Sequence, residues 1–221
     1  GYDSAGIALL NSGLQLVKTK GKVADLEEKA KQNSSSGTLG IGHTRWATHG
    51  IPNDVNSHPH TSNSGRLVLV HNGIIENYES LRAYLKEQGF SFSSETDTEV
   101  LVNLIEYIQI TQRLKTGKAV QIALNQVVGA YAIAVFDKER PAEMVVAKLG
   151  SPLAIGLGKD EYFVASDASP FIEYTKRSIY LEDNEMAVIS LEKGLKMYSI
   201  PDNSRVDPNV QELQLSLEKI E

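Results

Sequence analysis

The sequence of 221 residues contains no cysteine, a single tryptophan and no long apolar run. The absence of cysteine excludes a disulfide framework, a thiolate zinc site and a cysteine nucleophile among these residues. No uninterrupted apolar stretch approaches the ~18 residues that a membrane-spanning helix requires. Because 41% of the residues are hydrophobic and 23% are charged, a disordered acidic chain is also excluded. The composition predicts a soluble globular protein with an ample core.

Positively charged residues are outnumbered by negatively charged ones. The chain has 22 Lys and Arg against 28 Asp and Glu, a net charge of -6, and no predicted element carries a basic cluster. This pattern predicts neither a nucleic-acid partner nor a membrane surface. No basic region followed by an apolar stretch opens the sequence, so we expect a cytoplasmic protein.

Hydrophobic periodicity divides the chain into strands and helices that cluster instead of alternating. Turn residues separate the predicted strands, which cover 5–10, 14–18, 39–44, 67–71, 130–136, 143–147, 153–157, 162–165, 186–191 and 195–200. Capping and 3.6-residue periodicity predict helices over 22–32, 78–88, 96–108 and 119–127. Asn77 is the expected N-cap of the second helix, and Gly89 follows its end. Without strict βαβ alternation, the pattern favours an α+β fold.

The last residues have their own pattern. After Pro208, apolar residues recur at helical spacing, at Val210, Leu213, Leu217 and Ile220. The spacing predicts an amphipathic helix over 209–221, which either docks on its own domain or leads into another.

Polar residues suited to chemistry are concentrated in one region. All five His and the only Trp lie between His43 and His71, mostly without helix or strand periodicity. Long polar loops that follow strands often carry binding or catalytic residues. Because the strands 39–44 and 67–71 both end in this region, we expect their ends to face one pocket.

Two other kinds of site fit the sequence poorly. His58, His60 and His49 could bind a metal, but their spacing matches no conventional metal motif. A Ser/His/Asp hydrolase would need a G-x-S-x-G elbow, which the segment 1–6 lacks. No P-loop or dinucleotide fingerprint is present, so the sequence gives no support for a phosphate-binding loop.

Three features together fit an amino acid amide. Arg45 suits a carboxylate, although a surface arginine stacked on Trp46 is the simpler interpretation. Asp97 suits an ammonium group, although helix capping is common for Asp. Asn72 and Gly73 offer a side-chain amide beside an open backbone N–H, a pair that can stabilise an oxyanion. The combination suggests a glutamine-like ligand.

Six sequence blocks, in order along essentially the whole chain, resemble one family. They are 1–6 (GYDSAG), 43–50 (HTRWATHG), 56–60 (NSHPH), 70–77 (VHNGIIEN), 94–99 (SETDTE) and 150–153 (GSPL). These blocks resemble the glutaminase domain of glucosamine-6-phosphate synthases, which are class II glutamine amidotransferases. The resemblance implies the four-layer αββα sandwich of the N-terminal-nucleophile hydrolases.

The resemblance also implies roles for individual residues. Arg45 would hold the α-carboxylate of L-glutamine and Asp97 its ammonium group. Asn72 and Gly73 would form the oxyanion hole. The remaining implied pocket residues are Trp46, in a loop that closes over glutamine, and Thr48, His49 and His58. No metal or organic cofactor is implied.

One departure from the family is serious, because its nucleophile is an N-terminal Cys and Gly1 has no side chain. We therefore expect residues 1–208 to be a glutaminase domain without its first strand, and inactive alone. The segment 209–221 would lead toward an absent sugar isomerase domain. The full-length enzyme would be a homodimer that passes ammonia to fructose 6-phosphate. A glutamine-binding module without catalysis, or an amidotransferase with another acceptor, are the alternatives.

Overall fold

The computed structural model describes residues 3–46 and 50–214. Its helices are α1 (Val23–Gln32), α2 (Tyr78–Glu87), α3 (Asp97–Thr111) and α4 (Thr116–Leu124). Its strands are β1 (Ser4–Leu10), β2 (Leu14–Lys20), β3 (Leu39–Arg45), β4 (His60–Thr61), β5 (Leu67–Ile75), β6 (Gly129–Asp137), β7 (Glu143–Leu149), β8 (Ala154–Leu157), β9 (Tyr162–Ala165), β10 (Arg177–Tyr180), β11 (Glu185–Ser190), β12 (Gly194–Ser199), β13 (Arg205–Val206) and β14 (Gln211–Glu212). None of the helices in these ranges is long and apolar enough to cross a membrane.

The strands form three antiparallel sheets. The largest has seven strands in the order β13-β12-β11-β7-β6-β5-β4, and the two smaller sheets have the orders β2-β1-β3 and β14-β10-β8-β9. In the largest sheet, β5 pairs with β6 along its whole length, from Leu67 opposite Asp137 to Ile75 opposite Gly129.

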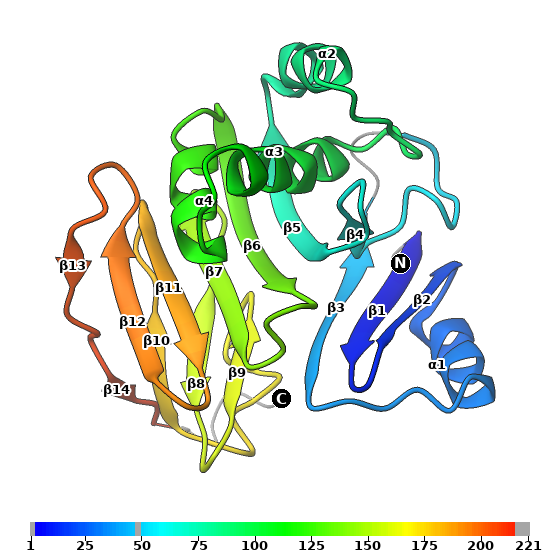
Figure 1. Ribbon diagram of the computed structural model, residues 1–221. Helices are drawn as coiled ribbons and strands as arrows, with labels where there is room; N and C mark the ends of the chain where they lie inside the picture. The colour runs from blue at the N-terminus through cyan, green and yellow to red at the C-terminus, as the bar shows by residue number, and fades with distance from the viewer. Residues whose placement is uncertain (1–2, 47–49, 215–221) are drawn as a thin grey trace.

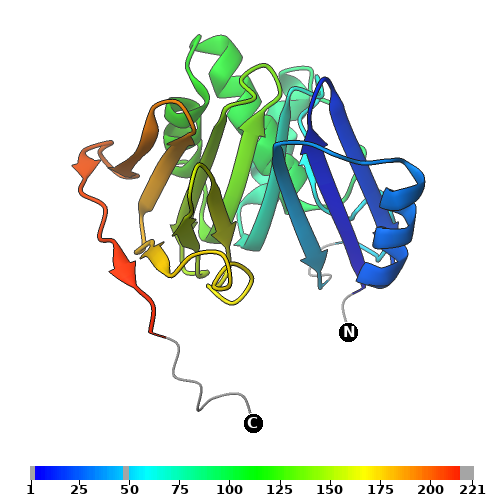
Figure 2. The same cartoon turned by 90° about the horizontal axis from the view of Figure 1, so that it is seen from below.

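The sheets and helices stack in four layers (Figures 1 and 2). One face of the seven-stranded sheet packs against α3 and α4 through an apolar cluster that includes Leu69, Leu101 and Val120. Its other face packs against both smaller sheets. Helix α1 covers the outer face of the three-stranded sheet, where Leu26 contacts Val17. The order is α-β-β-α, which confirms the predicted α+β sandwich.

Helix α3 packs between α2 and α4 on the seven-stranded sheet, and 12 of its 15 residues are buried. The hydroxyl of Thr96 accepts a hydrogen bond from the backbone N–H of Glu99, as a capping box requires. The Glu99 carboxylate instead accepts from the backbone N–H groups of Ser93 and Ser94, at 3.1 and 2.7 Å. The carboxylate thereby fixes the loop that enters the helix.

Several predicted boundaries are wrong. Helix α4 begins and ends three residues earlier than predicted, and the short strand β10 was not predicted. Helix α2 begins as predicted, with Asn77 at its N-cap position. The Asn77 side chain makes no capping hydrogen bond, because it donates to the Gln126 carbonyl and accepts from the Val128 N–H instead. That amide joins the start of α2 to the segment before β6.

The predicted C-terminal helix is not formed in the described part of its range, which ends at residue 214. The segment is extended there, and β14 pairs with β10. The Leu213 N–H donates to the Lys176 carbonyl at 2.8 Å, and its side chain packs beside Phe171. Tertiary pairing therefore overrides the helical spacing. Residues 215–221 lie outside the described residues.

Candidate functional site

A polar cavity of about 280 Å³ lies where the end of β3, the middle of β5 and the start of α3 meet. It is lined by His43, Thr44, Arg45, Trp46, His58, His71, Asn72, Gly73, Thr96, Asp97, Thr98 and Ser166. Six predicted site residues are among them: Arg45, Trp46, His58, Asn72, Gly73 and Asp97. Predicted Thr48 and His49 lie outside the described residues.

Arg45 is the last residue of β3 and is buried, with 3% of its surface exposed. Burial lowers the pKa of its guanidinium, whereas the carboxylates of Asp3, Asp97 and Glu95 raise it. Its Nη2 donates to the Gly50 carbonyl at 3.4 Å. The interpretation of Arg45 as a surface arginine is therefore wrong. A buried cation that nearby carboxylates stabilise suits a small anionic group.

Asp97 is the first residue of α3, and the helix cap is Thr96. Capping therefore does not explain Asp97. Its carboxylate is 4% exposed, and Oδ2 accepts a hydrogen bond of 2.8 Å from the Ile75 N–H. This bond fixes the orientation of the carboxylate at the start of the helix. The Asp97 carboxylate and the Arg45 guanidinium thus line the same cavity.

Asn72 and Gly73 lie inside β5, which continues to Ile75, four residues beyond the predicted end. Gly73 has φ +118, and a Cβ there would lie 2.2 Å from the Ala130 carbonyl oxygen. Only glycine fits this close approach of β5 to β6. The strand can therefore pass the cavity with a backbone N–H that no side chain shields.

The Asn72 side chain is oriented by His43. The His43 Nε2 lies 2.7 Å from Asn72 Oδ1. Burial lowers the pKa of His43 to about 4, so the ring is neutral near pH 7. When Nε2 carries the proton, His43 donates to Oδ1 and leaves the two amide N–H groups of Asn72 for other acceptors.

A cluster of histidines supports the cavity. The rings of His43 and His58 stack with centroids 4.2 Å apart, and His60 meets His58 edge-on at 4.9 Å. Burial, followed by the neighbouring rings and cations, lowers the pKa of His58 and His60 well below the usual value. His71 Nδ1 lies 3.0 Å from Thr98 Oγ1. The packed rings of His43 and His58 thus form one polar wall of the cavity, and His60 supports it from behind.

Several of the lining residues were not predicted. They are His43, Thr44, His71, Thr96, Thr98 and Ser166. The histidine concentration marked the region without assigning these rings a role, and Ser166 had no local signal, because it follows β9 far along the chain. No group of three or more His, Cys, Asp or Glu among the described residues is arranged to hold a metal ion.

Comparison with known proteins identifies the chain. Residues 10–215 match the model of the family described as "Glutamine amidotransferase domain". The chain belongs to the glutamine amidotransferase domain family. Two relatives named glutamine–fructose-6-phosphate aminotransferase [isomerizing] cover the whole chain: that of Bacteroides thetaiotaomicron is 54% identical and that of Chlorobaculum tepidum 48% identical. The chain spans only 36% of the length of each.

Solved structures support the same fold. The glutamine phosphoribosylpyrophosphate amidotransferase from B. subtilis is 29% identical, with a TM-score of 0.77 over 92% of this chain and 44% of that one. A glutamine aminotransferase class-II domain protein from Silicibacter pomeroyi has a TM-score of 0.63 at 17% identity, over 88% of this chain and 90% of that one. This amidotransferase domain therefore has the sandwich of the N-terminal-nucleophile hydrolases, as predicted.

Proposed function

We propose that this domain binds L-glutamine in the 280 Å³ cavity and, within a longer protein, releases its amide nitrogen as ammonia. The observation that carries the proposal is the meeting of a buried Arg45, a buried Asp97 and the Asn72–Gly73 pair in one cavity. Arg45 would pair with the α-carboxylate and Asp97 with the ammonium group. Such paired recognition fixes the amide end of the ligand.

The amide end would then meet the oxyanion donors. The Asn72 amide, held by His43, and the Gly73 N–H would stabilise the negative charge that develops on the amide oxygen. Trp46, 71% exposed at the rim, would cover bound glutamine together with the adjoining residues Thr48 and His49. His58 would support the pocket through its stack on His43.

The chemistry needs a nucleophile that these 221 residues do not supply as cysteine. We therefore expect glutamine binding without sustained hydrolysis by this domain alone. The full-length protein would use the ammonia to convert fructose 6-phosphate into glucosamine 6-phosphate in a sugar isomerase domain, as a cytoplasmic homodimer. The 54% identity to the Bacteroides aminotransferase supports this acceptor.

Calorimetric titration of L-glutamine into the domain tests the binding site. We expect saturable heat, and at least tenfold weaker binding by Asp97→Asn, since one charge-assisted contact contributes about 1.5–3 kcal/mol. Asparagine can still accept from the Ile75 N–H, so this variant keeps the structural bond. Arg205→Ala, at an exposed arginine over Tyr198, is the matched control.

Two results would refute the binding proposal. One is the absence of heat with millimolar L-glutamine from a folded protein. The other is equal binding of D-glutamine, because recognition of the carboxylate, the ammonium group and the side-chain amide at three separate points must distinguish the enantiomers. Production of glucosamine 6-phosphate by the longer protein, measured with fructose 6-phosphate and L-glutamine, tests the acceptor separately.

A further inference from the structure

One buried side chain joins the two loop segments that lie next to the charged groups of the candidate site. Segment 50–57 lies between β3 and β4, and segment 93–96 leads into α3, whose first residue is Asp97. Asn56 connects them and is 1% exposed. Because a buried amide must find its hydrogen-bond partners within the protein, the bonds of Asn56 show what it holds together.

The Asn56 amide makes three hydrogen bonds. Its Nδ2 donates to the Glu95 carboxylate at 3.0 Å, and its Oδ1 accepts from the Glu95 N–H at 2.9 Å. The same Nδ2 donates to the Ile51 carbonyl at 2.9 Å. An amide offers a donor and an acceptor side by side, so a carboxylate or an apolar side chain of similar size cannot make the same three bonds.

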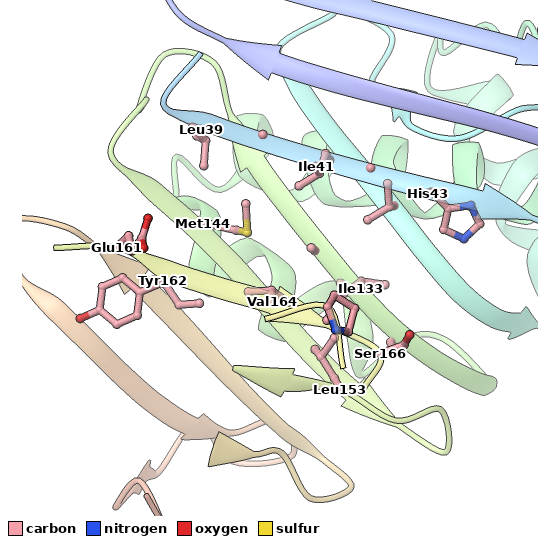
Figure 3. Close-up of a pocket in the computed structure, with 18 of the residues that line it drawn as sticks. Leu39, Ile41, His43, Ile133, Met144, Leu153, Glu161, Tyr162, Val164 and Ser166 are labelled. Atoms are coloured by element: carbon pink, nitrogen blue, oxygen red, sulfur yellow. The ribbon is translucent and has the colours of Figure 1, made fainter. Parts of the chain in front are cut away.

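On one side, these bonds reach the guanidinium of Arg45. Strand β3 runs past His43 (Figure 3) and ends at Arg45, whose Nη2 donates to the carbonyl of Gly50, the neighbour of Ile51. Gly50 has φ +76, and a Cβ there would lie 2.5 Å from Asn56 Nδ2. The Asn56 amide therefore packs directly against the backbone that orients Arg45.

On the other side, the bonds reach Asp97, two residues after Glu95. The Arg82 guanidinium, on α2, donates to the carbonyls of Ser94 and Thr96 at 2.9 and 3.1 Å. These bonds hold the backbone on both sides of Glu95. The position of Asp97 therefore depends on that of Glu95.

We propose that Asn56 is a positioning residue that fixes the spacing between Arg45 and Asp97, and thereby favours ligands with a carboxylate and an ammonium group on one carbon atom. This inference rests on the proposed function. Asn56 does not line the cavity, so it acts through these two residues.

Each charged group also has an anchor of its own. Arg45 lies at the end of β3, and the Asp97 carboxylate accepts from the Ile75 N–H. Without the Asn56 amide, each group should still bind its own partner. The two would no longer be held at the distance that a single α-carbon requires, and the advantage of binding both groups at once depends on such preorganisation.

An NMR titration of the 221-residue chain tests the spacing. Trp46 lines the cavity and is the only tryptophan, so it gives a single indole N–H signal. The ligands are L-glutamine, glutaramate, which lacks the ammonium group, and 4-aminobutanamide, which lacks the carboxylate. We expect the wild type to bind L-glutamine at least about tenfold more tightly than either truncated ligand. In Asn56→Ala, L-glutamine should bind about tenfold more weakly, whereas the affinities for the truncated ligands should change less than about twofold.

The matched control is Asn125→Ala. The Asn125 amide also donates to two backbone carbonyls, those of Gln121 and Ile200, at 3.1 and 2.9 Å. It joins α4 to the residue after β12 and does not line the cavity. This variant should lose stability in urea, as Asn56→Ala does, but keep the preference for L-glutamine. A comparable loss of preference in both variants would overturn the inference.

Amide hydrogen exchange in the wild type is a second measurement, which decides if Asn56→Ala does not fold. Because coupling is reciprocal, a ligand that requires the spacing must stabilise the bonds that fix it, and by the same factor. L-Glutamine at saturation should therefore slow exchange of the Glu95 N–H, which donates to Asn56, about tenfold more than either truncated ligand does.

Two further results would overturn the inference while leaving glutamine binding intact. One is equal slowing of the Glu95 N–H by all three ligands. The other is a folded Asn56→Ala that keeps its affinity for L-glutamine or loses affinity for all three ligands equally. If the folded wild type does not bind L-glutamine, the proposed function itself is refuted, and this inference with it.

Discussion

Replacement of Gly73 by alanine tests the close approach of β5 to β6 on which the candidate site depends. The added Cβ would lie 2.2 Å from the Ala130 carbonyl oxygen, at a φ of +118. The backbone strain costs about 1–3 kcal/mol. The steric overlap adds about 1–3 kcal/mol, because the paired backbone must move. The expected loss of about 2–6 kcal/mol is a large part of the 5–15 kcal/mol typical of a folded domain.

Gly194→Ala separates the two contributions. Gly194 has φ +77, but a Cβ there would meet nothing within 4 Å. This control therefore carries strain without overlap. Urea denaturation followed by circular dichroism gives the free energy of unfolding of both variants. The reasoning fails if Gly73→Ala is no less stable than Gly194→Ala.

Three further predictions concern stability. Phe171→Ala should cost about 3–5 kcal/mol in a urea titration, since Phe171 is 1% exposed, whereas Tyr174→Ala, at a 68% exposed ring, should cost far less; equal losses would contradict this. Asp137→Ala removes the carboxylate that accepts from Arg66 at 2.7–3.0 Å and should lower the melting temperature by several degrees, and an unchanged value would refute it. Burial lowers the pKa of His43 to about 4, so the unfolded chain binds more protons than the folded chain between about pH 6.5 and 4. The free energy of unfolding should therefore decrease as the pH is lowered through that window, and it should decrease less in His43→Gln; equal slopes would contradict the assignment.

Local patterns predicted most of the secondary structure, because alternating apolar residues indicate strands wherever one face is buried. They failed where pairing partners are distant in sequence. Leu213 belongs to a series of apolar residues at helical spacing, yet pairing with β10 keeps its segment extended. Asn77 is a residue type that commonly caps helices with its side chain, yet its amide forms hydrogen bonds with Gln126 and Val128 instead. Such choices depend on tertiary contacts that no local window contains.

For the candidate site, too, local sequence identified some residues, whereas others depended on tertiary contacts. Arg45 and Asp97 were candidates from their chemistry and from the family resemblance, and both line the cavity. Asn72 and Gly73 were expected after a strand and lie within one, since β6 extends the pairing to Ile75. Ser166 could not be found, because it reaches the cavity only through the packing of the four-stranded sheet on the seven-stranded sheet.

The pairing of β5 with β6 also bears on synthesis of the chain. Asn72 and Gly73 pair with Ala132 and Tyr131, which follow after three helices. Closing a loop of this length costs entropy before the pairing is gained. On the ribosome, β5 stays without this neighbour until residue 137 has left the exit tunnel. The chain therefore exposes an apolar strand for several seconds of translation, at about 5–20 residues per second. A chaperone that binds extended apolar segments would find its target in this interval.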